Sequence, residues 1–310
     1  MGDLLKMAAV PNRALGAAIA IALAAGASLL LVFGPAPGSV IAGDDPFARL
    51  SNAGAGSLTV GLPPPAEQRI YGAASARGRP IVVIDPGHGG RDPRARSVDH
   101  DPDDATVGTI AEKDLSLALA NALREQLIKR GRVRVAMTRE DDRYLTLEQR
   151  AAVARRLGAG LFVSLHIDSA PNPLARGVSI YSLSDVASDA EAARFAAAEN
   201  RGASGAIEAA DPVQALLSDL AMRGQMTASA DFAARLVGKA SGRVGLRPEP
   251  HRFAAFHVLR RSGTPAVLVE AGYLSNPDDD KLLRSPAYRA ALVEALAQAI
   301  EADIAARATR

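Results

Sequence analysis

Two histidines and two glutamates stand where apolar stretches of this chain end or a helical pattern begins. His88 follows the run IVVID within the turn PGHGG, and His166 follows LFVSL. Glu270 closes AVLVE, and Glu112 opens EKDLSLA. Apolar runs of this length are typical of buried strands, and ligands of open α/β sheets bind beyond the carboxyl ends of strands. The four side chains can therefore converge on one site although they are far apart in the sequence.

The residue types in this group suit a catalytic zinc site. Such sites commonly use three protein ligands and keep an open position for water. His88, Glu112 and His166 would supply two nitrogens and one carboxylate, and Glu270 would be the neighbouring base. Each residue alone has a structural alternative: Glu112 could cap its helix, His166 could be a satisfied histidine, and Glu270 could pair with an arginine. The occurrence of all four together favours the zinc site.

The glycines around His88 indicate a tight turn that something approaches closely. Gly87, Gly89 and Gly90 leave the backbone free to adopt conformations that other residues avoid, and they remove side chains from its path. A histidine held in such a turn could merely cap a backbone group. With the other three residues, the turn favours a metal that comes near to His88.

The rest of the pattern predicts one α/β domain that extends from residue 80 to residue 310. Strands are expected from apolar runs at 81–85, 133–138, 161–165, 177–182 and 266–270. Helical patterns separate them, including 112–130 and a final helix from Pro286. This alternation is typical of a largely buried sheet with helices. Residues 184–243 depart from it, because they are helix-like throughout and resemble an insertion lying over the domain.

The N-terminal part predicts export. Lys6 and Arg13 precede a continuous apolar run from 14 to 33, which is the layout of a signal peptide and is also long enough to span a bilayer. We expect residues 1–43 to be a signal peptide or a membrane anchor. Residues 44–79 are rich in Gly, Ala, Ser and Pro, which predicts a flexible linker.

Composition excludes several classes of function. The 310 residues include no cysteine, which rules out disulfides, a thiol nucleophile and a cysteine-rich zinc site. Lys and Arg number 36 and Asp and Glu 34, so the formal charge of +2 predicts no nucleic-acid partner. No G-x-S-x-G motif is present, which disfavours a serine hydrolase of the α/β-hydrolase type.

Four motifs resemble those of the zinc-dependent N-acetylmuramoyl-L-alanine amidases of bacterial cell-wall splitting, of the type called amidase 3. They are IVVIDPGHGGRDP, EKDLSLALANAL, FVSLHIDSAPNP and VLVEAGYLSNPDD, and they occur in family order. The resemblance implies a mixed, mostly parallel sheet flanked by helices. It implies zinc on His88, Glu112 and His166, with Glu270 as the catalytic acid–base. The expected reaction is hydrolysis of the amide that joins the muramoyl lactyl group to L-alanine of the stem peptide.

The resemblance also implies regulation. In division amidases of this type, a helical insertion plugs the zinc site until an activator protein displaces it. Residues 184–243 would be this lid, and Glu199 or Glu208 could occupy the open metal position. These helices could instead only widen the domain or line the substrate groove.

We therefore expect a periplasmic peptidoglycan hydrolase that acts in daughter-cell separation. Its partners would be peptidoglycan and an activator protein, with anchoring to the inner membrane if the N-terminal segment is retained. Two alternatives stay open. One is a zinc peptidase that cuts within the stem peptide, and the other is a module that binds peptidoglycan without catalysis.

Overall fold

The computed structural model describes residues 68–72, 76–97, 109–201, 203 and 212–309. All of them lie in the compact unit Pro63–Arg310. The expected signal or anchor, most of the expected linker and Glu208 lie outside the described residues. Within the described ranges, no helix is long and apolar enough to cross a membrane.

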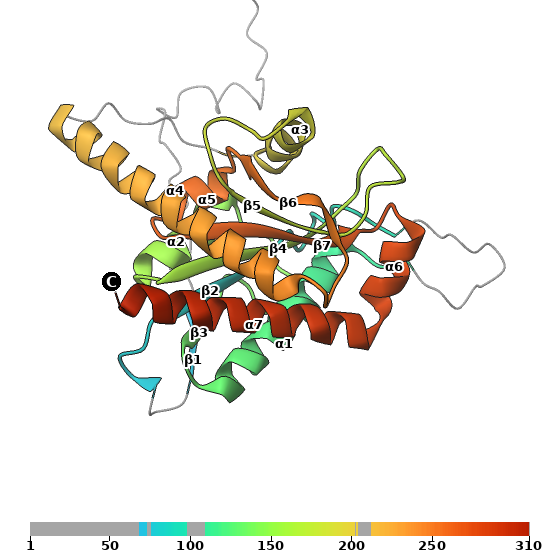
Figure 1. Cartoon of the computed structure of the whole chain (residues 1–310), viewed down its shortest axis with the longest axis horizontal. Helices are drawn as coiled ribbons and strands as arrows, with labels where there is room; N and C mark the ends of the chain where they lie inside the picture. The colour runs from blue at the N-terminus through green and yellow to red at the C-terminus, as the bar shows by residue number, and fades with distance from the viewer. Residues whose placement is uncertain (1–67, 73–75, 98–108, 202, 204–211, 310) are drawn as a thin grey trace, which may run out of the picture. The chain divides into compact units, whose positions relative to one another are not determined.

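In the described part of the chain, seven strands form one mixed sheet (Figure 1). The strands are β1 (Ile70–Tyr71), β2 (Ile81–Pro86), β3 (Arg134–Met137), β4 (Leu161–Asp168), β5 (Val178–Leu183), β6 (Leu246–Ala254) and β7 (Ala266–Tyr273). Their order across the sheet is β1-β3-β2-β4-β7-β5-β6. The central strands β3, β2, β4 and β7 are parallel, whereas β1 pairs antiparallel with β3 and β5 antiparallel with β7. The expected mixed, mostly parallel sheet is confirmed.

The strands on which the site depends are almost entirely buried, and the edge strand β6 is not. The described residues of β2, β5 and β7 are all buried, as are all but the last residue of β4. Near-continuous apolar runs of this kind are typical of strands covered on both faces. Strand β6 contains Pro248 and Pro250 and has exposed residues, a composition that edge strands tolerate. For this reason its sequence did not predict a strand.

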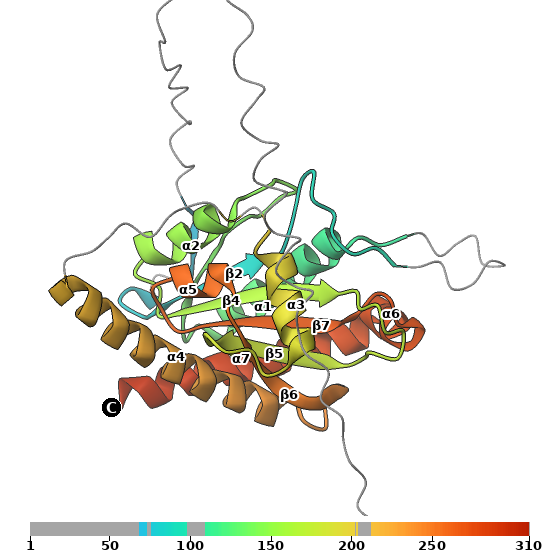
Figure 2. The same cartoon turned by 90° about the horizontal axis from the view of Figure 1, so that it is seen from above.

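Helices cover both faces of the sheet (Figure 2). The helices are α1 (Glu112–Arg130), α2 (Leu147–Arg156), α3 (Ala190–Glu199), α4 (Pro212–Ala240), α5 (His257–Arg261), α6 (Pro277–Arg284) and α7 (Pro286–Ala308). Buried residues of α1, α4 and α7 share one apolar core with one face of the sheet, and those of α2, α3 and α5 share a second core with the other face.

The alternation of side chains along β4 and β7 determines on which face of the sheet the candidate residues lie. Successive side chains of a strand point to opposite faces. Leu165 and Val269 lie in the core under α1, α4 and α7. Their neighbours His166 on β4 and Glu270 on β7 therefore point to the face covered by α2, α3 and α5, and the two residues are partners in the β4–β7 register.

Short sequence signals set the start of one helix and the end of another. Thr146 Oγ1 accepts a hydrogen bond from the Gln149 amide at 3.2 Å, and the Gln149 side chain accepts one from the Thr146 amide at 2.9 Å. This capping box begins α2. Helix α1 ends at Gly131, which has a φ of 67°. The ends of α1 and α2 are therefore encoded locally.

The helical segment 184–243 has two different parts. Phe232, Leu236 and Ala240, in the second half of α4, are fully buried in the core that α4 shares with α7. In the first half, Leu216 and Leu220 are 61% and 56% exposed. The second half of α4 is thus a core element that leads into β6, and only α3 and the start of α4 lie outside that core.

The domain also begins before Pro80. Ile70 and Tyr71 form β1, which pairs with Ala136 and Val135 of β3, and Ala76 is fully buried. Residues 68–72 and 76–79, placed in the expected linker, are therefore part of the folded domain.

Candidate metal centre

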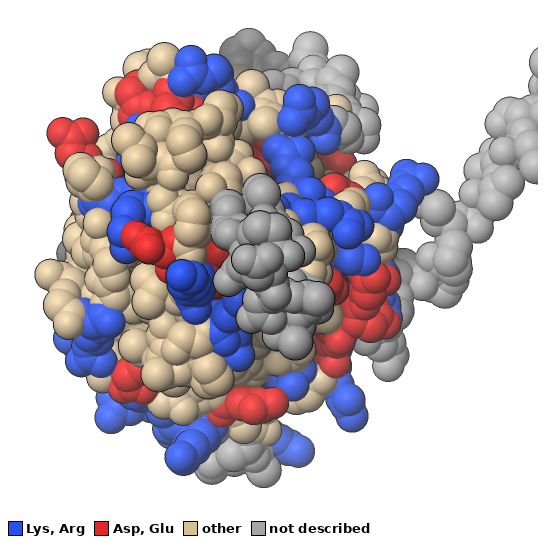
Figure 3. Space-filling view, turned by 90° about the vertical axis from the view of Figure 1, so that its right-hand side faces the viewer, with Lys and Arg blue, Asp and Glu red and all other residues tan. Residues whose placement is uncertain are grey.

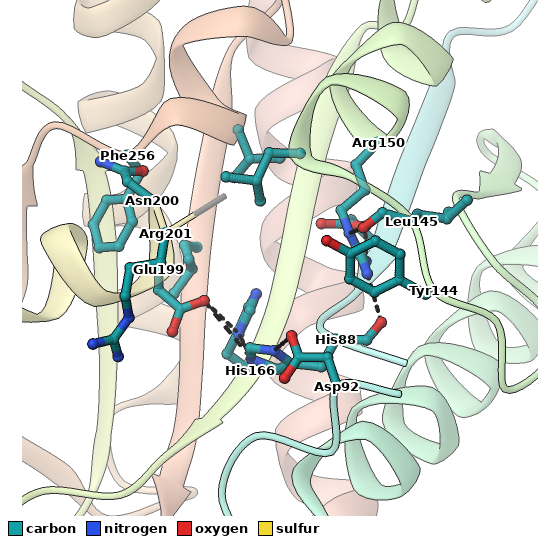
Figure 4. Close-up of a pocket in the computed structure, with 14 residues that line it drawn as sticks. His88, Asp92, Tyr144, Leu145, Arg150, His166, Glu199, Asn200, Arg201 and Phe256 are labelled. Atoms are coloured by element: carbon teal, nitrogen blue, oxygen red, sulfur yellow. Dashed lines mark hydrogen bonds and ion pairs between the residues drawn. The ribbon is translucent and has the colours of Figure 1, made fainter. Parts of the chain in front are cut away.

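His88, Glu112 and His166 meet at the carboxyl-terminal ends of β2 and β4, where β4 continues past the expected residue 165 and includes His166. Figure 4 shows the two histidines next to each other, and their rings are nearly perpendicular. The distances among His88 Nε2, His166 Nδ1 and Glu112 Oε1 are all 3.1 Å. Ligand atoms at about 2.0–2.1 Å from a tetrahedral zinc ion are roughly 3.3 Å apart. Two imidazole nitrogens and a carboxylate at this spacing fit a zinc ion. The structure thus brings together the three residues that the sequence predicted as ligands.

The turn that carries His88 is held by two buried arginines. His88 has a φ of 55°, in the left-handed region that residues other than glycine rarely adopt. Arg150 donates to the Pro86 carbonyl at 2.6 Å and to the His88 carbonyl at 2.5 Å. Arg139 donates to the Gly87 carbonyl at 2.7 Å. These hydrogen bonds fix three successive carbonyls and so stabilise the strained turn.

The ring of His166 occupies the space that a side chain at position 87 would need. A Cβ atom on Gly87 would lie 2.5 Å from His166 Cε1, closer than any real contact. The glycine therefore lets His166 approach the His88 turn. On its other side, His88 Nδ1 donates to Asp92 Oδ2 at 2.9 Å, which turns Nε2 toward His166 and Glu112 in the way that carboxylates orient metal-binding histidines.

Backbone amides orient Glu112. Its Oε1 accepts from the Ile167 amide at 3.1 Å, and its Oε2 accepts from the Ala95 amide at 3.3 Å. Burial raises the pKa of Glu112, but His88 and His166 lower it more, so the pKa lies below its ordinary value. Burial likewise lowers the pKa of His88, and Glu112 and Asp92 overcome this effect and raise it to about 10. His88 and Glu112 therefore each favour the charged form of the other.

Glu270 is a buried carboxylate beside this group. It is 0% exposed, and neither of its oxygens has a hydrogen-bond partner among the described residues. Burial raises its pKa well above the ordinary value, and the charges of Asp168, Glu112 and Glu199 add to this effect. A buried carboxylate without a partner costs free energy of folding. Its presence next to the ligands favours a chemical role.

Glu199, the last residue of α3, also reaches the site (Figure 4). Its Oε2 lies 3.7 Å from His88 Nε2 and 3.8 Å from His166 Nδ1, and the side chain is 9% exposed. Its Oε1 pairs with Arg94 Nη2 at 2.9 Å. Of the two acidic residues expected in the lid, Glu199 lies against the histidines, and Glu208 lies outside the described residues.

Two cavities adjoin Glu199. A small cavity of about 50 Å³ is lined by His88, His166 and Glu199. A larger groove of about 580 Å³ is lined by Glu112, Glu199, Asp168 and other residues, among them the arginines Arg94, Arg96, Arg194 and Arg201. Glu199 and Arg201 line both spaces, whereas His88 and His166 line only the small cavity.

The side of the molecule beyond α6 has a mixed charge. Figure 3 shows Lys and Arg side chains next to Asp and Glu on this side, with undescribed residues over part of it. This distribution agrees with the nearly neutral composition, and no field of a single sign covers the visible surface.

Sequence reasoning missed four residues that shape the site: Asp92, Arg94, Arg139 and Arg150. Asp92 follows His88 by four residues, and this spacing is a signal that could have identified it. Arg150 contacts His88 across a separation of 62 residues. Nothing in the local sequence around either buried arginine points to this contact.

Known proteins of one family are similar to this chain. The family model described as N-acetylmuramoyl-L-alanine amidase matches residues 82–302. The amidase AmiC of Neisseria meningitidis is 32% identical over 267 residues, covering 83% of this chain and 62% of the relative. AmiA of Escherichia coli is 32% identical over 235 residues, covering 74% of this chain and 77% of the relative. The chain thus spans about three fifths of the Neisseria protein.

Solved structures show the same fold. An N-acetylmuramoyl-L-alanine amidase from Clostridium difficile has a TM-score of 0.50 at 25% identity, covering 72% of this chain and 95% of that one. The catalytic domain of CwlV from Paenibacillus polymyxa has a TM-score of 0.50 at 26% identity, covering 71% of this chain and 96% of that one. Because the family model matches well over half of its residues, the chain belongs to the N-acetylmuramoyl-L-alanine amidase family.

Proposed function

We propose that this protein is a zinc-dependent hydrolase that cleaves the amide between N-acetylmuramic acid and L-alanine of the peptidoglycan stem peptide. One observation carries the proposal: His88 Nε2, His166 Nδ1 and Glu112 Oε1 form a triangle of ligand size, and the partnerless carboxylate of Glu270 lies beside it. Family membership supplies the substrate.

Each of these residues has a task in the proposed reaction. An amide resists hydrolysis because water is a weak nucleophile and the nitrogen is a poor leaving group. Zinc held by His88, Glu112 and His166 would polarise the carbonyl and lower the pKa of water from about 15.7 to about 7. Asp92 keeps the His88 ring oriented. Glu270, whose pKa is raised by burial, accepts a proton from water and passes it to the nitrogen of L-alanine.

The test compares the full chain with its Glu270→Gln variant on purified peptidoglycan. We expect about one zinc per chain in both proteins. The variant should release stem peptides about 10²- to 10⁴-fold more slowly. Glu125→Gln is the matched control, since the Glu125 side chain is 73% exposed and lies more than three helical turns after Glu112 on α1. It should behave like the parent.

Mass analysis of the released material separates the alternatives. An amidase frees intact stem peptides from muramic acid, whereas a zinc peptidase yields shortened peptides. A module that only binds peptidoglycan releases neither product. Loss of zinc without loss of turnover would contradict the proposed mechanism.

We also propose that α3 is a lid, with Glu199 as its plug. Glu199 lies against both histidines, and it lines both the small cavity beside them and the larger groove. Salt bridges hold the start of α3, between Arg252 and Asp189 and between Arg247 and Glu191. An activator protein that displaces α3 would open the site.

If α3 is a lid, Glu199→Ala should raise basal turnover. A contact of Glu199 that stabilises the closed state by about 1–3 kcal/mol corresponds to an increase of about 5- to 150-fold. Steady-state release of stem peptides by equally zinc-loaded proteins measures this. Glu191→Ala is a useful companion, since it loosens α3 without emptying the plug position. If the Glu199→Ala variant turns over no faster than the parent, α3 only lines the groove and is not a lid.

Periplasmic location and a role in daughter-cell separation complete the proposal. The apolar run from 14 to 33 supports export, and peptidoglycan lies outside the cytoplasmic membrane. N-terminal sequencing of the protein recovered from cells distinguishes a cleaved signal from a retained anchor.

A further inference from the structure

The carboxylate of Glu199 is held at two points. Its Oε2 lies 3.7 Å and 3.8 Å from the ring nitrogens of His88 and His166, and its Oε1 is 2.9 Å from Arg94 Nη2. One oxygen therefore faces the proposed zinc ligands, and the other faces a guanidinium. The Glu199 side chain is only 9% exposed, so this position is largely shielded from water.

The proposed reaction forms the same chemical group at this place. Hydrolysis of the amide bonds the water oxygen to the carbonyl carbon and breaks the C–N bond. The carbonyl oxygen and the water oxygen become the two oxygens of the product carboxylate. The carboxylate of Glu199 therefore has the same chemical form as the product, and Arg94 contacts the Glu199 oxygen that lies away from the histidines.

Arg94 is placed by the same backbone that holds a ligand. Its neighbour Ala95 accepts a hydrogen bond from the Glu112 amide at 2.8 Å and donates one to Glu112 Oε2 at 3.3 Å. Arg94 has a φ of 51°. Among the described non-glycine residues, only His88 and Glu249 share a positive φ. Strained backbone of this kind is retained where the surroundings impose it, commonly at functional sites.

We propose that Arg94 is a further catalytic residue, which binds the scissile carbonyl oxygen, and that Glu199 inhibits by imitating the product carboxylate. This inference rests on the proposed function. During the reaction Arg94 donates hydrogen bonds to the oxygen on which negative charge develops, and it loses no proton. Both water protons pass through Glu270 to the nitrogen, leaving a carboxylate and an ammonium group. A donor aimed at such an oxygen stabilises the transition state.

The test uses the full, zinc-loaded chain in four forms: the parent, Arg94→Met, Glu199→Ala and the double variant. In the Glu199→Ala background, Arg94→Met should lower kcat by about 10²- to 10³-fold with unchanged zinc content. Arg132→Met in the same background controls for loss of a surface charge, since the Arg132 side chain is 72% exposed. Added guanidinium should partly restore turnover to Arg94→Ala in this background.

If Arg94 only held Glu199 in place, the variants would show the opposite pattern of turnover. Arg94→Met alone would then raise turnover as Glu199→Ala does, and the double variant would equal Glu199→Ala. That result would overturn the proposal.

Binding of N-acetylmuramic acid, which carries the product carboxylate, is the second readout. Calorimetry should detect binding to Glu199→Ala and a loss of at least about tenfold in affinity when Arg94 is also replaced, equal to about 1.4 kcal/mol. Equal binding by both proteins, or binding by neither, contradicts the proposal. If Glu199→Ala releases no stem peptides from peptidoglycan, the proposed function fails, and this binding experiment still decides the role of Arg94.

Discussion

At the scale of single residues, the site is a set of charges that compensate one another inside the protein. His88 is 7% exposed and Glu112 is 2% exposed. A single buried charge without a partner would cost much free energy of folding, because it loses its hydration. Their proximity raises the pKa of His88 to about 10 and lowers that of Glu112. A metal requires neutral histidine ligands. Metal and proton therefore compete for His88.

This competition predicts proton release when zinc binds. At pH 7.5, the metal-free protein should release about one proton from His88, whereas a histidine with an ordinary pKa near 6.5 would release about 0.1. Calorimetry in buffers of different ionisation enthalpy measures the number. The background should be Glu270→Gln with Asp168→Asn, because burial raises the pKa of both carboxyls, that of Asp168 to about 7.

The pH dependence has a definite sign. Since the pKa of His88 is raised on folding, its contribution to the stability of the metal-free protein is complete below about pH 6.5 and is lost as pH rises toward 10. Zinc affinity should rise about tenfold per pH unit between pH 7 and 9. A proton count near 0.1 would show that His88 is neutral before zinc arrives.

At the scale of elements, α3 and α4 differ in what holds them. Helix α3 is tied to β6 by Arg252–Asp189 and packs Phe195 against aromatic rings, with a centroid distance of 5.2 Å to Tyr181. Helix α4 buries Leu236 in the main core, while its Leu220 faces solvent. An element with few buried apolar contacts opens at lower free energy. Helix α3 therefore suits a lid, and the second half of α4 does not.

Two leucine substitutions in α4 test this division. Leu236→Ala should lower the free energy of unfolding by about 2–5 kcal/mol, because it leaves a cavity in the core. Leu220→Ala should change it by no more than about 0.5 kcal/mol. Denaturant unfolding of the zinc-loaded proteins measures both. Similar losses for the two variants would mean that α4 is packed along its whole length.

At the scale of the whole molecule, the parallel strands at the centre of the sheet bring the residues of the candidate site together. Strands β2, β4 and β7 run in the same direction, so their carboxyl ends lie along one edge. Helix α1 begins at that edge and brings Glu112 to the histidines. On the opposite side of β2, the sheet continues through β3 to β1, which lies before the expected start of the domain.

The short strand β1 should contribute to stability. Tyr71 donates to Glu140 Oε2 at 2.5 Å, and Arg124 stacks on the Tyr71 ring with a distance of 4.8 Å from its guanidinium carbon to the centroid. A chain shortened to residues 80–310 should therefore be less stable than one shortened to 68–310, by about 1–3 kcal/mol. Thermal unfolding at equal zinc content measures the difference. Equal stability would make residues 68–79 a linker after all.

The sequence by itself determined the α/β fold and the four residues of the proposed centre. Buried central strands need continuous apolar runs, and these runs are visible in the chain. Since ligands gather where parallel strands end, the residues after those runs could be identified one by one. Helix ends were equally readable, because a capping box or a terminal glycine acts within a few residues.

Only the tertiary structure decided the surroundings of that centre. It showed that Glu199 lies against the histidines, that Arg94 pairs with it, and that Arg150 supports the His88 turn. It also divided α4 into a core half and an exposed half. Contacts of this kind join residues that are distant in the chain, and they depend on burial and packing rather than on local spacing.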